Sequence, residues 1–189
     1  MLDVEVCFER YCKEHDLEIA LSWEMQEGYE TAFGSFDPTC RTLFLNKSLL
    51  QTAPEQEALF YLYHELRHAL QYLRPELFDQ QVQISRFYVI LYNGVCYKLV
   101  DNTWKMSVLT GDTEHFKAAY LSLPYELDAN TYAYQTVKEI IGNTAALQEL
   151  ASRWIPAKPL PAAVLSNRQK YLLRKADKVF SPLIRLVIS

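Results

Sequence analysis

The sequence predicts an α+β domain in which a long helix packs on a small, mostly antiparallel sheet. Three observations favour this fold class. Apolar residues recur at helical spacing over residues 59–73, residues 29–46 resemble two strands around a turn, and half of the 189 residues are hydrophobic. A chain of this length and composition can bury a core of its own, so a disordered chain is excluded.

The elements before the long helix are a helix and a hairpin. The first twenty residues predict a helix, because Val4, Phe8 and Cys12 are spaced for one face. Residues 29–46 predict a β-hairpin whose turn is Asp-Pro-Thr at residues 37–39.

Local signals also predict where the long helix begins and ends. Thr52 and Glu55 form a capping box, and Pro54 suits the first turn. Pro75 ends the apolar pattern, because proline cannot continue a helix.

This helix contains the sequence HELRH, in which His64 and His68 are four residues apart. Four residues are just over one helical turn, so both imidazoles can reach one metal ion. Glu65 then projects beside the metal, where it can hold and deprotonate a water molecule. The pattern predicts one Zn²⁺ per chain and zinc-assisted attack on a carbonyl group. The alternative is that both histidines border the core and Glu65 is solvated.

Zinc in a catalytic site needs a third protein ligand. The only other histidines are His15 and His115, so a carboxylate is the stronger candidate. Glu126 lies in a second predicted helix, which Ser122 would cap and which Gly142 would end. An acidic first turn that complements the helix dipole is the alternative interpretation of Glu126. A cysteine ligand has no motif behind it.

Asn130 and Asp128, which follow Glu126 in the same predicted helix, are expected to support the metal ligands without binding the metal. Asn130 follows Glu126 by four residues on the same face, where it can hydrogen-bond a ligating histidine. Asp128 lies about 200° around the helix from Glu126, so the two carboxylates are not expected to ligate together.

The HELRH and ELDANTYA sequences resemble the gluzincin group of zinc metallopeptidases, and the second is similar to the ExEA(N/D)xFA pattern of ImmA/IrrE-type peptidases. The resemblance implies a zincin-like fold, with zinc on His64, His68 and Glu126 and with Glu65 as the general base. It also implies that Asn130 takes the place of a supporting carboxylate. Asp128 departs from the pattern, which usually has Glu there.

The resemblance has two further implications. An edge strand of the sheet would line the cleft and pair with an extended protein or peptide substrate. A tyrosine or histidine would donate a hydrogen bond to the oxyanion of the intermediate. No spacing rule selects that donor among the candidates Tyr120, Tyr125, Tyr132 and His115.

Residues 76–121 form a long insertion between the two motif helices. It is predicted to be mainly helical, with one helix near residues 78–92 and another that Asp112 caps and that runs through Tyr120. The insertion could form a wall of the cleft, a lid or a scaffold.

The last 34 residues are predicted to form a separate basic segment. Residues 156–189 hold seven Lys or Arg and one Asp, a local charge of +6, against −10 for residues 1–155. Residues 1–155 would be the metallopeptidase domain, and 156–189 would dock on it through a helix over 167–180 and an apolar strand.

Composition limits location and partners. The chain has no run of 18 apolar residues and no signal-peptide pattern at its N-terminus, so no membrane association is expected. Four scattered cysteines indicate reduced thiols in a cytoplasmic protein. A net charge of −4 disfavours general nucleic-acid binding.

The sequence therefore predicts a zinc-dependent metallopeptidase that hydrolyses a protein substrate with metal-activated water. The first alternative is a regulatory or protein-interaction protein that binds zinc and cleaves nothing. A second is a nucleic-acid-binding protein that uses the basic C-terminal segment.

Overall fold

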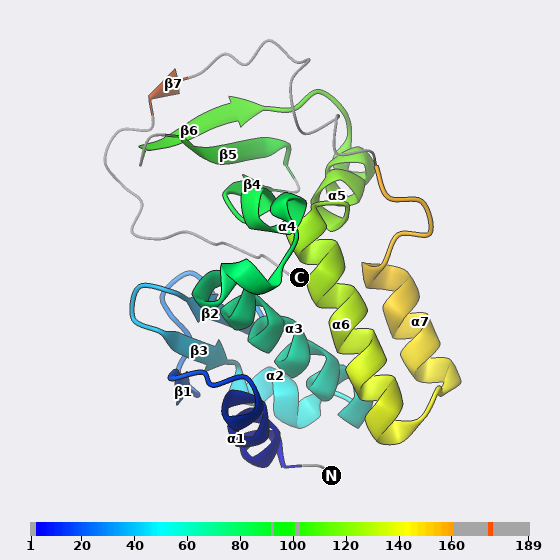
Figure 1. Ribbon diagram of the computed structural model, residues 1–189. Helices are drawn as coiled ribbons and strands as arrows, with labels where there is room; N and C mark the ends of the chain where they lie inside the picture. Colours follow the sequence, from blue (N-terminus) through cyan, green and yellow to red (C-terminus); the bar gives the residue numbers. More distant parts are fainter. Residues whose placement is uncertain (1–2, 92, 101–102, 161–173, 176–189) are drawn as a thin grey trace.

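A computed structural model describes residues 3–91, 93–100, 103–160 and 174–175 (Figure 1). The described helices are α1 (Val4–Glu14), α2 (Lys47–Thr52), α3 (Glu55–Leu73), the 3₁₀ helix η1 (Pro75–Leu77), α4 (Gln80–Ser85), α5 (Thr113–Leu121), α6 (Pro124–Ile141) and α7 (Ala145–Trp154). The described strands are β1 (Ala20–Ser22), β2 (Gly34–Asp37), β3 (Thr42–Leu45), β4 (Tyr88–Ile90), β5 (Val95–Val100), β6 (Thr103–Val108) and β7 (Arg174–Lys175).

The described strands form two separate small sheets. In the three-stranded sheet the order is β1-β3-β2, with β1 parallel and β2 antiparallel to β3. In the other sheet the order is β4-β5-β6-β7, and every pair is antiparallel. The α+β class predicted from the sequence is therefore confirmed, and the predicted hairpin over residues 29–46 corresponds to β2 and β3.

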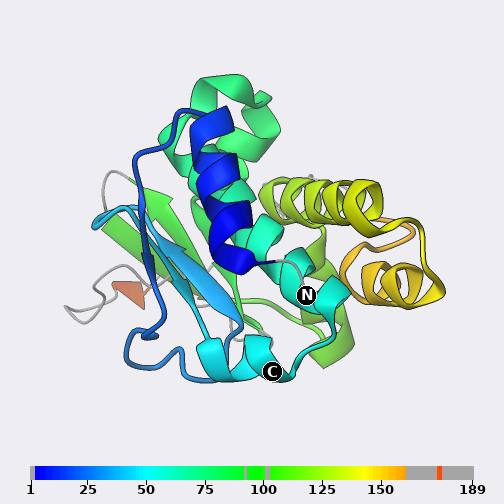
Figure 2. The same cartoon turned by 90° about the horizontal axis from the view of Figure 1, so that it is seen from below.

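The long helix α3 lies at the centre of the molecule. It packs along α6 more extensively than any other pair of elements, and β2, α1 and α7 contact it as well (Figures 1 and 2). The predicted apolar stripe is buried, and so is most of the remaining circumference of α3 between Ala58 and Gln71. Because of this, the polar residues His64, Glu65, His68 and Gln71 are enclosed although they lie on different sides of the helix.

The capping box predicted for α3 is wrong. Thr52 is the last residue of α2, and its hydroxyl donates to the carbonyl oxygens of Ser48 and Leu49 at 3.2 and 3.1 Å. Pro54 takes the N-cap position of α3 and makes no side-chain cap. The reason is that Asn46 starts α2 just upstream, accepting a hydrogen bond from the Leu49 amide at 3.2 Å.

The N-cap of the second motif helix lies one residue later than predicted, so the prediction that Ser122 caps it is wrong. Ser122 follows α5 as its C-cap, and its hydroxyl donates to the carbonyl oxygen of Ala118 at 2.6 Å. Leu123 precedes α6 instead, with Pro124 in the first turn, where its fixed φ and missing N–H are tolerated. Gly142 ends α6 with a φ of 86°, a left-handed conformation that glycine adopts without strain.

The prediction of a mainly helical insertion is wrong for its middle part. Helices α4 and α5 are present, and Asp112 caps α5 as expected, but β4, β5 and β6 lie between them. Polar and apolar residues alternate in β6, whereas β5 is apolar except for Lys98, and the register pairs Val100 with Thr103 across a two-residue connection. Short apolar strands of this kind are readily confused with helix segments in a sequence.

Most of the C-terminal segment lies outside the described residues. The exceptions are residues 156–160 and β7, where Arg174 and Lys175 pair with Met106 and Lys105 of β6. A helix was predicted over these two residues, so that part of the prediction is wrong. The docking of residues 167–189 stays a prediction. Among the described helices, none is both long and apolar enough to cross a membrane.

Candidate metal centre

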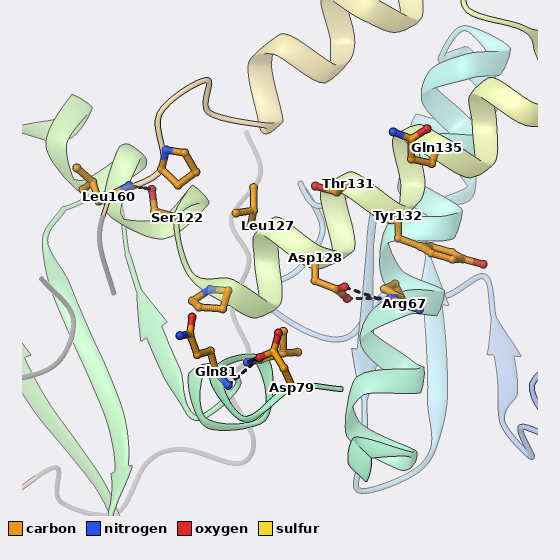
Figure 3. A pocket seen from close by; sticks show the side chains of 13 residues that line it. Arg67, Asp79, Gln81, Ser122, Leu127, Asp128, Thr131, Tyr132, Gln135 and Leu160 are labelled. Atoms are coloured by element: carbon orange, nitrogen blue, oxygen red, sulfur yellow. Dashed lines mark hydrogen bonds and ion pairs between the residues drawn. The ribbon is translucent and has the colours of Figure 1, made fainter. Parts of the chain in front are cut away.

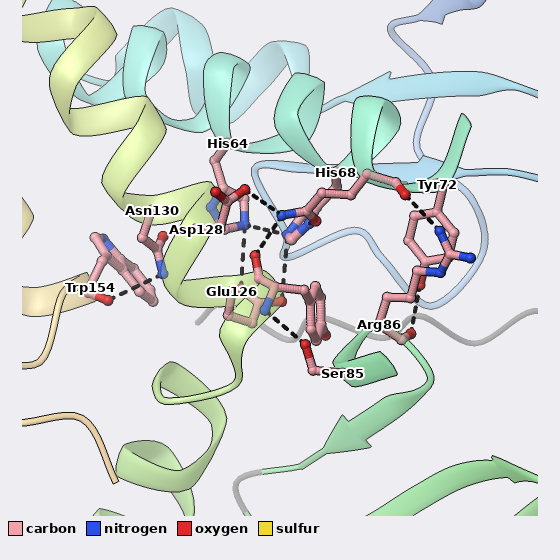
Figure 4. Close-up of polar contacts among 11 residues, drawn as sticks. His64, His68, Tyr72, Ser85, Arg86, Glu126, Asp128, Asn130 and Trp154 are labelled. Atoms are coloured by element: carbon pink, nitrogen blue, oxygen red, sulfur yellow. Dashed lines mark hydrogen bonds and ion pairs between the residues drawn. The ribbon is translucent and has the colours of Figure 1, made fainter. Parts of the chain in front are cut away.

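Three buried side chains from two helices converge on one point. The Nε2 atoms of His64 and His68 lie 3.0 Å apart, since the two residues stand one turn apart on α3. Glu126, in the first turn of α6, places its carboxylate oxygens 3.6 Å from the Nε2 of His64 and 3.5 Å from the Nε2 of His68. Figure 4 shows the three side chains pointing toward one another.

The spacing and chemistry of these atoms fit a zinc ion. Ligand atoms about 2.1 Å from a tetrahedral zinc lie about 3.4 Å from one another. One ligand atom from each of the three residues falls within 4.8 Å of the others. Among the described residues, neither oxygen of the fully buried Glu126 accepts a hydrogen bond of good geometry. A buried carboxylate left this way is costly unless a cation compensates it.

Burial and mutual charge shift the pKa values of the cluster. Burial, together with the neighbouring His68, lowers the pKa of His64 to about 3. Burial disfavours charge on His68 too, but Glu126 outweighs it and raises the pKa of His68 to about 9. Burial also opposes the charge of Glu126, yet His68 holds the pKa of that carboxyl below its usual range. A metal ion would therefore replace the positive charge that the raised pKa of His68 otherwise places beside Glu126.

Glu65 lies beside the cluster without belonging to it. It is 3% exposed, and burial raises the pKa of its carboxyl to about 7. Strand β2 passes so close that a Cβ on Gly34 would lie 2.9 Å from Cγ of Glu65. Glycine at residue 34 therefore permits the close approach of β2 to the carboxylate that follows His64.

Asp128 does not join the three converging residues. Its carboxylate accepts two hydrogen bonds from Arg67, from Nε at 2.8 Å and from Nη2 at 3.0 Å. It also accepts one from Nε2 of Gln71 at 2.8 Å. Gln71 in turn contacts Nδ1 of His68 through its Oε1 at 2.8 Å. The connection from Asp128 to a histidine of the cluster thus runs through a glutamine.

Asn130 is buried one turn after Glu126, and its amide nitrogen donates to the carbonyl oxygen of Trp154 at 3.2 Å. It lies close enough to His64 to raise that residue's pKa slightly against the effect of burial. Asn130 therefore holds α7 against α6 and also borders the first histidine.

The four candidates for an oxyanion donor are placed differently. Tyr120 lines the space beside His64 and Glu126, and its proximity contributes to lowering the pKa of Glu126. The ring of Tyr125 has its centroid 5.2 Å from that of His68. The ring of Tyr132 packs against the guanidinium of Arg67, whose Cζ atom lies 4.5 Å from the ring centroid.

His115 lies in the first turn of α5, and its ring packs against Phe116 with centroids 6.1 Å apart. The cluster of His64, His68 and Glu126 therefore has Tyr120 and Tyr125 as its neighbours among the four candidates.

Access to the cluster is closed. His64 and His68 are 2% and 4% exposed, and Phe60, Tyr61 and Trp154 cover the side of Glu126. The space that they enclose leaves no volume that a water molecule could occupy. An open groove of about 580 Å³ lies on another side of α6, where Arg67, Asp128 and Tyr132 form part of its wall (Figure 3).

Comparisons of the chain with protein-family models, with curated proteins and with solved structures found no match.

Sequence reasoning missed Gln71, which makes the direct contact to a histidine of the cluster. Its position three residues after His68 on the same helix was the available signal, because residues three apart on a helix are neighbours. A glutamine on a helix is most often a surface residue, so the signal is weak without the tertiary structure.

Proposed function

We propose that the protein is a zinc-dependent metallopeptidase with a zincin-like arrangement of α3, α6 and the three-stranded sheet. The observation that carries the proposal is the convergence of His64, His68 and Glu126 next to the buried carboxylate of Glu65. Two imidazoles and one carboxylate form a ligand set of catalytic zinc sites, which leaves a fourth position for water or substrate.

The residues have separable roles in this proposal. A zinc ion held by the three side chains would supply Lewis-acid activation of a carbonyl group and of a water molecule. Glu65 takes the proton from the attacking water and passes it to the leaving amine. A carboxyl whose pKa is raised to about 7 is suited to both steps near neutral pH. Tyr120 is the candidate best placed to donate to the oxyanion.

The substrate would be a protein or peptide segment bound in extended form along β2. Among the described strands, β2 pairs with β3 on one side and has no partner on the other. Its first residue, Gly34, lies against Glu65. A peptide added to this edge would run past the carboxylate that acts as the base. Because the cluster is closed, hydrolysis requires that the side chains covering it move apart.

The closure also favours a second candidate function, a zinc-binding protein that cleaves nothing. A site that encloses no volume for water beside Glu126 suits a metal with a purely structural role. The cytoplasmic location and the lack of a nucleic-acid partner stay predictions in both cases.

One set of measurements separates these functions. Purified protein should contain about one zinc per chain and cleave an unfolded protein substrate. Glu65→Gln should keep the zinc and lose activity by a factor of about 10² or more, because it removes the base. Glu76→Gln is the matched control, since Glu76 is exposed and pairs with Arg74 at 2.6 Å.

Bound zinc without cleavage of any flexible substrate would favour the second function, a zinc-binding protein that cleaves nothing. Cleavage that survives Glu65→Gln would refute the assigned mechanism.

A further inference from the structure

The contacts of Gln71 determine which way its amide group points. Its Nε2 atom lies 2.9 Å from the carbonyl oxygen of Tyr125 and 2.8 Å from Oδ2 of Asp128. Both partners are acceptors when Asp128 is ionised, and only the NH₂ end of an amide can donate to both. The Oε1 end of Gln71 must therefore face His68, at the observed 2.8 Å.

The orientation of Gln71 has a consequence for His68. A carbonyl oxygen can only accept, so Nδ1 of His68 must carry the proton that is shared with Oε1. In a neutral imidazole the other nitrogen, Nε2, is then the one with a free lone pair. That atom is the one that faces His64 and Glu126.

Asp128 is held in turn. Arg67 donates to both of its oxygens, and the guanidinium lies 4.5 Å from the ring centroids of both Phe78 and Tyr132. A paired, planar contact of this kind fixes the carboxylate more strictly than a single bond. The chain of contacts therefore runs from Arg67 in the groove wall to His68 in the buried cluster. The hydrogen bonds of each residue in this chain permit only one orientation of the next side chain.

We propose that Gln71 is a positioning residue that holds His68 as the Nδ1-protonated imidazole, with Nε2 free to bind zinc, and that Asp128 and Arg67 act through it. This inference rests on the metal site of the proposed function. The partners of ligating histidines commonly set the tautomer and ring orientation, and losing one lowers metal affinity about 10–100-fold.

The histidine tautomers of the zinc-loaded, ¹⁵N-labelled protein can be read from long-range ¹H–¹⁵N correlations of the side chains. The wild type should show a proton on Nδ1 of His68 and none on Nε2. A spectrum with His68 bound to zinc through Nδ1, or with no Nδ1 proton, would overturn the proposal without any variant.

Zinc affinity, measured by competition with a chelating dye, provides the second test. Gln71→Leu removes the acceptor at similar size and should weaken zinc binding about 10–100-fold. Gln135→Leu is the matched control, because Gln135 is an exposed residue of the same groove and should leave the affinity unchanged. Unchanged affinity in a folded Gln71→Leu variant would contradict the proposal.

Exchanging the amide of Gln71 with the carboxylate of Asp128 tests whether Gln71 positions His68 or only stabilises the fold. Gln71→Glu alone sets two carboxylates against each other, whereas Gln71→Glu with Asp128→Asn restores a donor between them and keeps an acceptor for His68. The double variant should recover the Nδ1 proton and bind zinc more tightly than Gln71→Leu. A double variant as weak as Gln71→Leu would indicate a merely structural role. Neither readout depends on hydrolysis, so a protein that binds zinc but cleaves nothing would refute the proposed function alone.

Discussion

The two sheets of this protein stand in different relations to the metal cluster. Every residue of β2 in the three-stranded sheet is buried, and β2 packs directly on α3 beside Glu65. In the other sheet the end of β6 is open, with Val108 64% exposed. In Figure 1 that sheet lies apart from the three-stranded sheet, which packs on α3. The first, three-stranded sheet therefore borders the cluster beside Glu65, whereas three of the four strands of the second sheet belong to the insertion.

The insertion also reaches the cluster, through Tyr120 beside Glu126 and through Ser85. Ser85, at the end of α4, accepts a hydrogen bond from the amide of Tyr125 at 3.0 Å, next to Glu126. Helix α4 therefore holds the first turn of α6 in place.

The largest effect is expected from the residues of the cluster itself. Glu126→Ala should reduce zinc content from about one per chain to near zero, as should His64→Ala or His68→Ala, because each removes a ligand. Asp128→Ala is the matched carboxylate control and should retain zinc with a modest loss of affinity, since Asp128 contacts Gln71 instead of the cluster. Elemental analysis after dialysis measures the zinc content of the ligand variants and of the control. A greater loss in Asp128→Ala than in Glu126→Ala would show that the ligand is misassigned.

The second-largest effect is expected at the contact between the three-stranded sheet and Glu65. Gly34→Ala places a Cβ 2.9 Å from Cγ of Glu65 and 3.1 Å from the carbonyl oxygen of Phe44, so one of them must shift. We expect a loss of stability of about 1–3 kcal/mol and lower hydrolytic activity with zinc retained. Thermal unfolding and the hydrolysis assay check these outcomes. Full activity in this variant would mean that the close approach of β2 is irrelevant to the base.

The turn of the first sheet gives a pH-dependent prediction. Asp37 is largely buried, and although burial opposes its charge, hydrogen bonds from Thr39 and Gln26 hold the pKa of its carboxyl below the ordinary 3.8. A lowered folded pKa means stability that is present above pH 3.8 and lost as the pH falls through the folded value. Asp37→Asn should therefore cost about 2 kcal/mol at neutral pH, and the difference should shrink in acid.

Urea unfolding of wild type and Asp37→Asn at several pH values measures this effect. A difference that is the same at neutral and at strongly acidic pH would show that charge plays no part in the turn.

The smallest effect is expected in the second sheet. Val108→Ser changes an exposed residue at the end of β6, so stability should change by no more than about 0.5 kcal/mol. Zinc affinity and hydrolysis should match the wild type. A clear loss of zinc in this variant would contradict the separation between the two sheets.

Local sequence signals predicted well those elements whose own residues determine them. The helical spacing around HELRH, Gly142 at the end of α6, and Asp112 at the start of α5 all correspond to the structure. The signals failed where two patterns compete for one segment. Thr52 and Glu55 match a capping box, but Asn46 starts a helix that already contains Thr52. Strands β5 and β6 were missed, because a short apolar run such as β5 fits strand and helix alike.

The sequence by itself determined that His64 and His68 stand one turn apart on a helix with Glu65 beside them, because helical geometry depends on local spacing alone. Only the tertiary structure decided that Glu126 meets them across 57 intervening residues, that the cluster is closed to water, and that Gln71 joins Asp128 to His68. These features depend on how α3 packs against α6. That packing is the result of many small contacts distributed over the whole core, and no short stretch of sequence contains it.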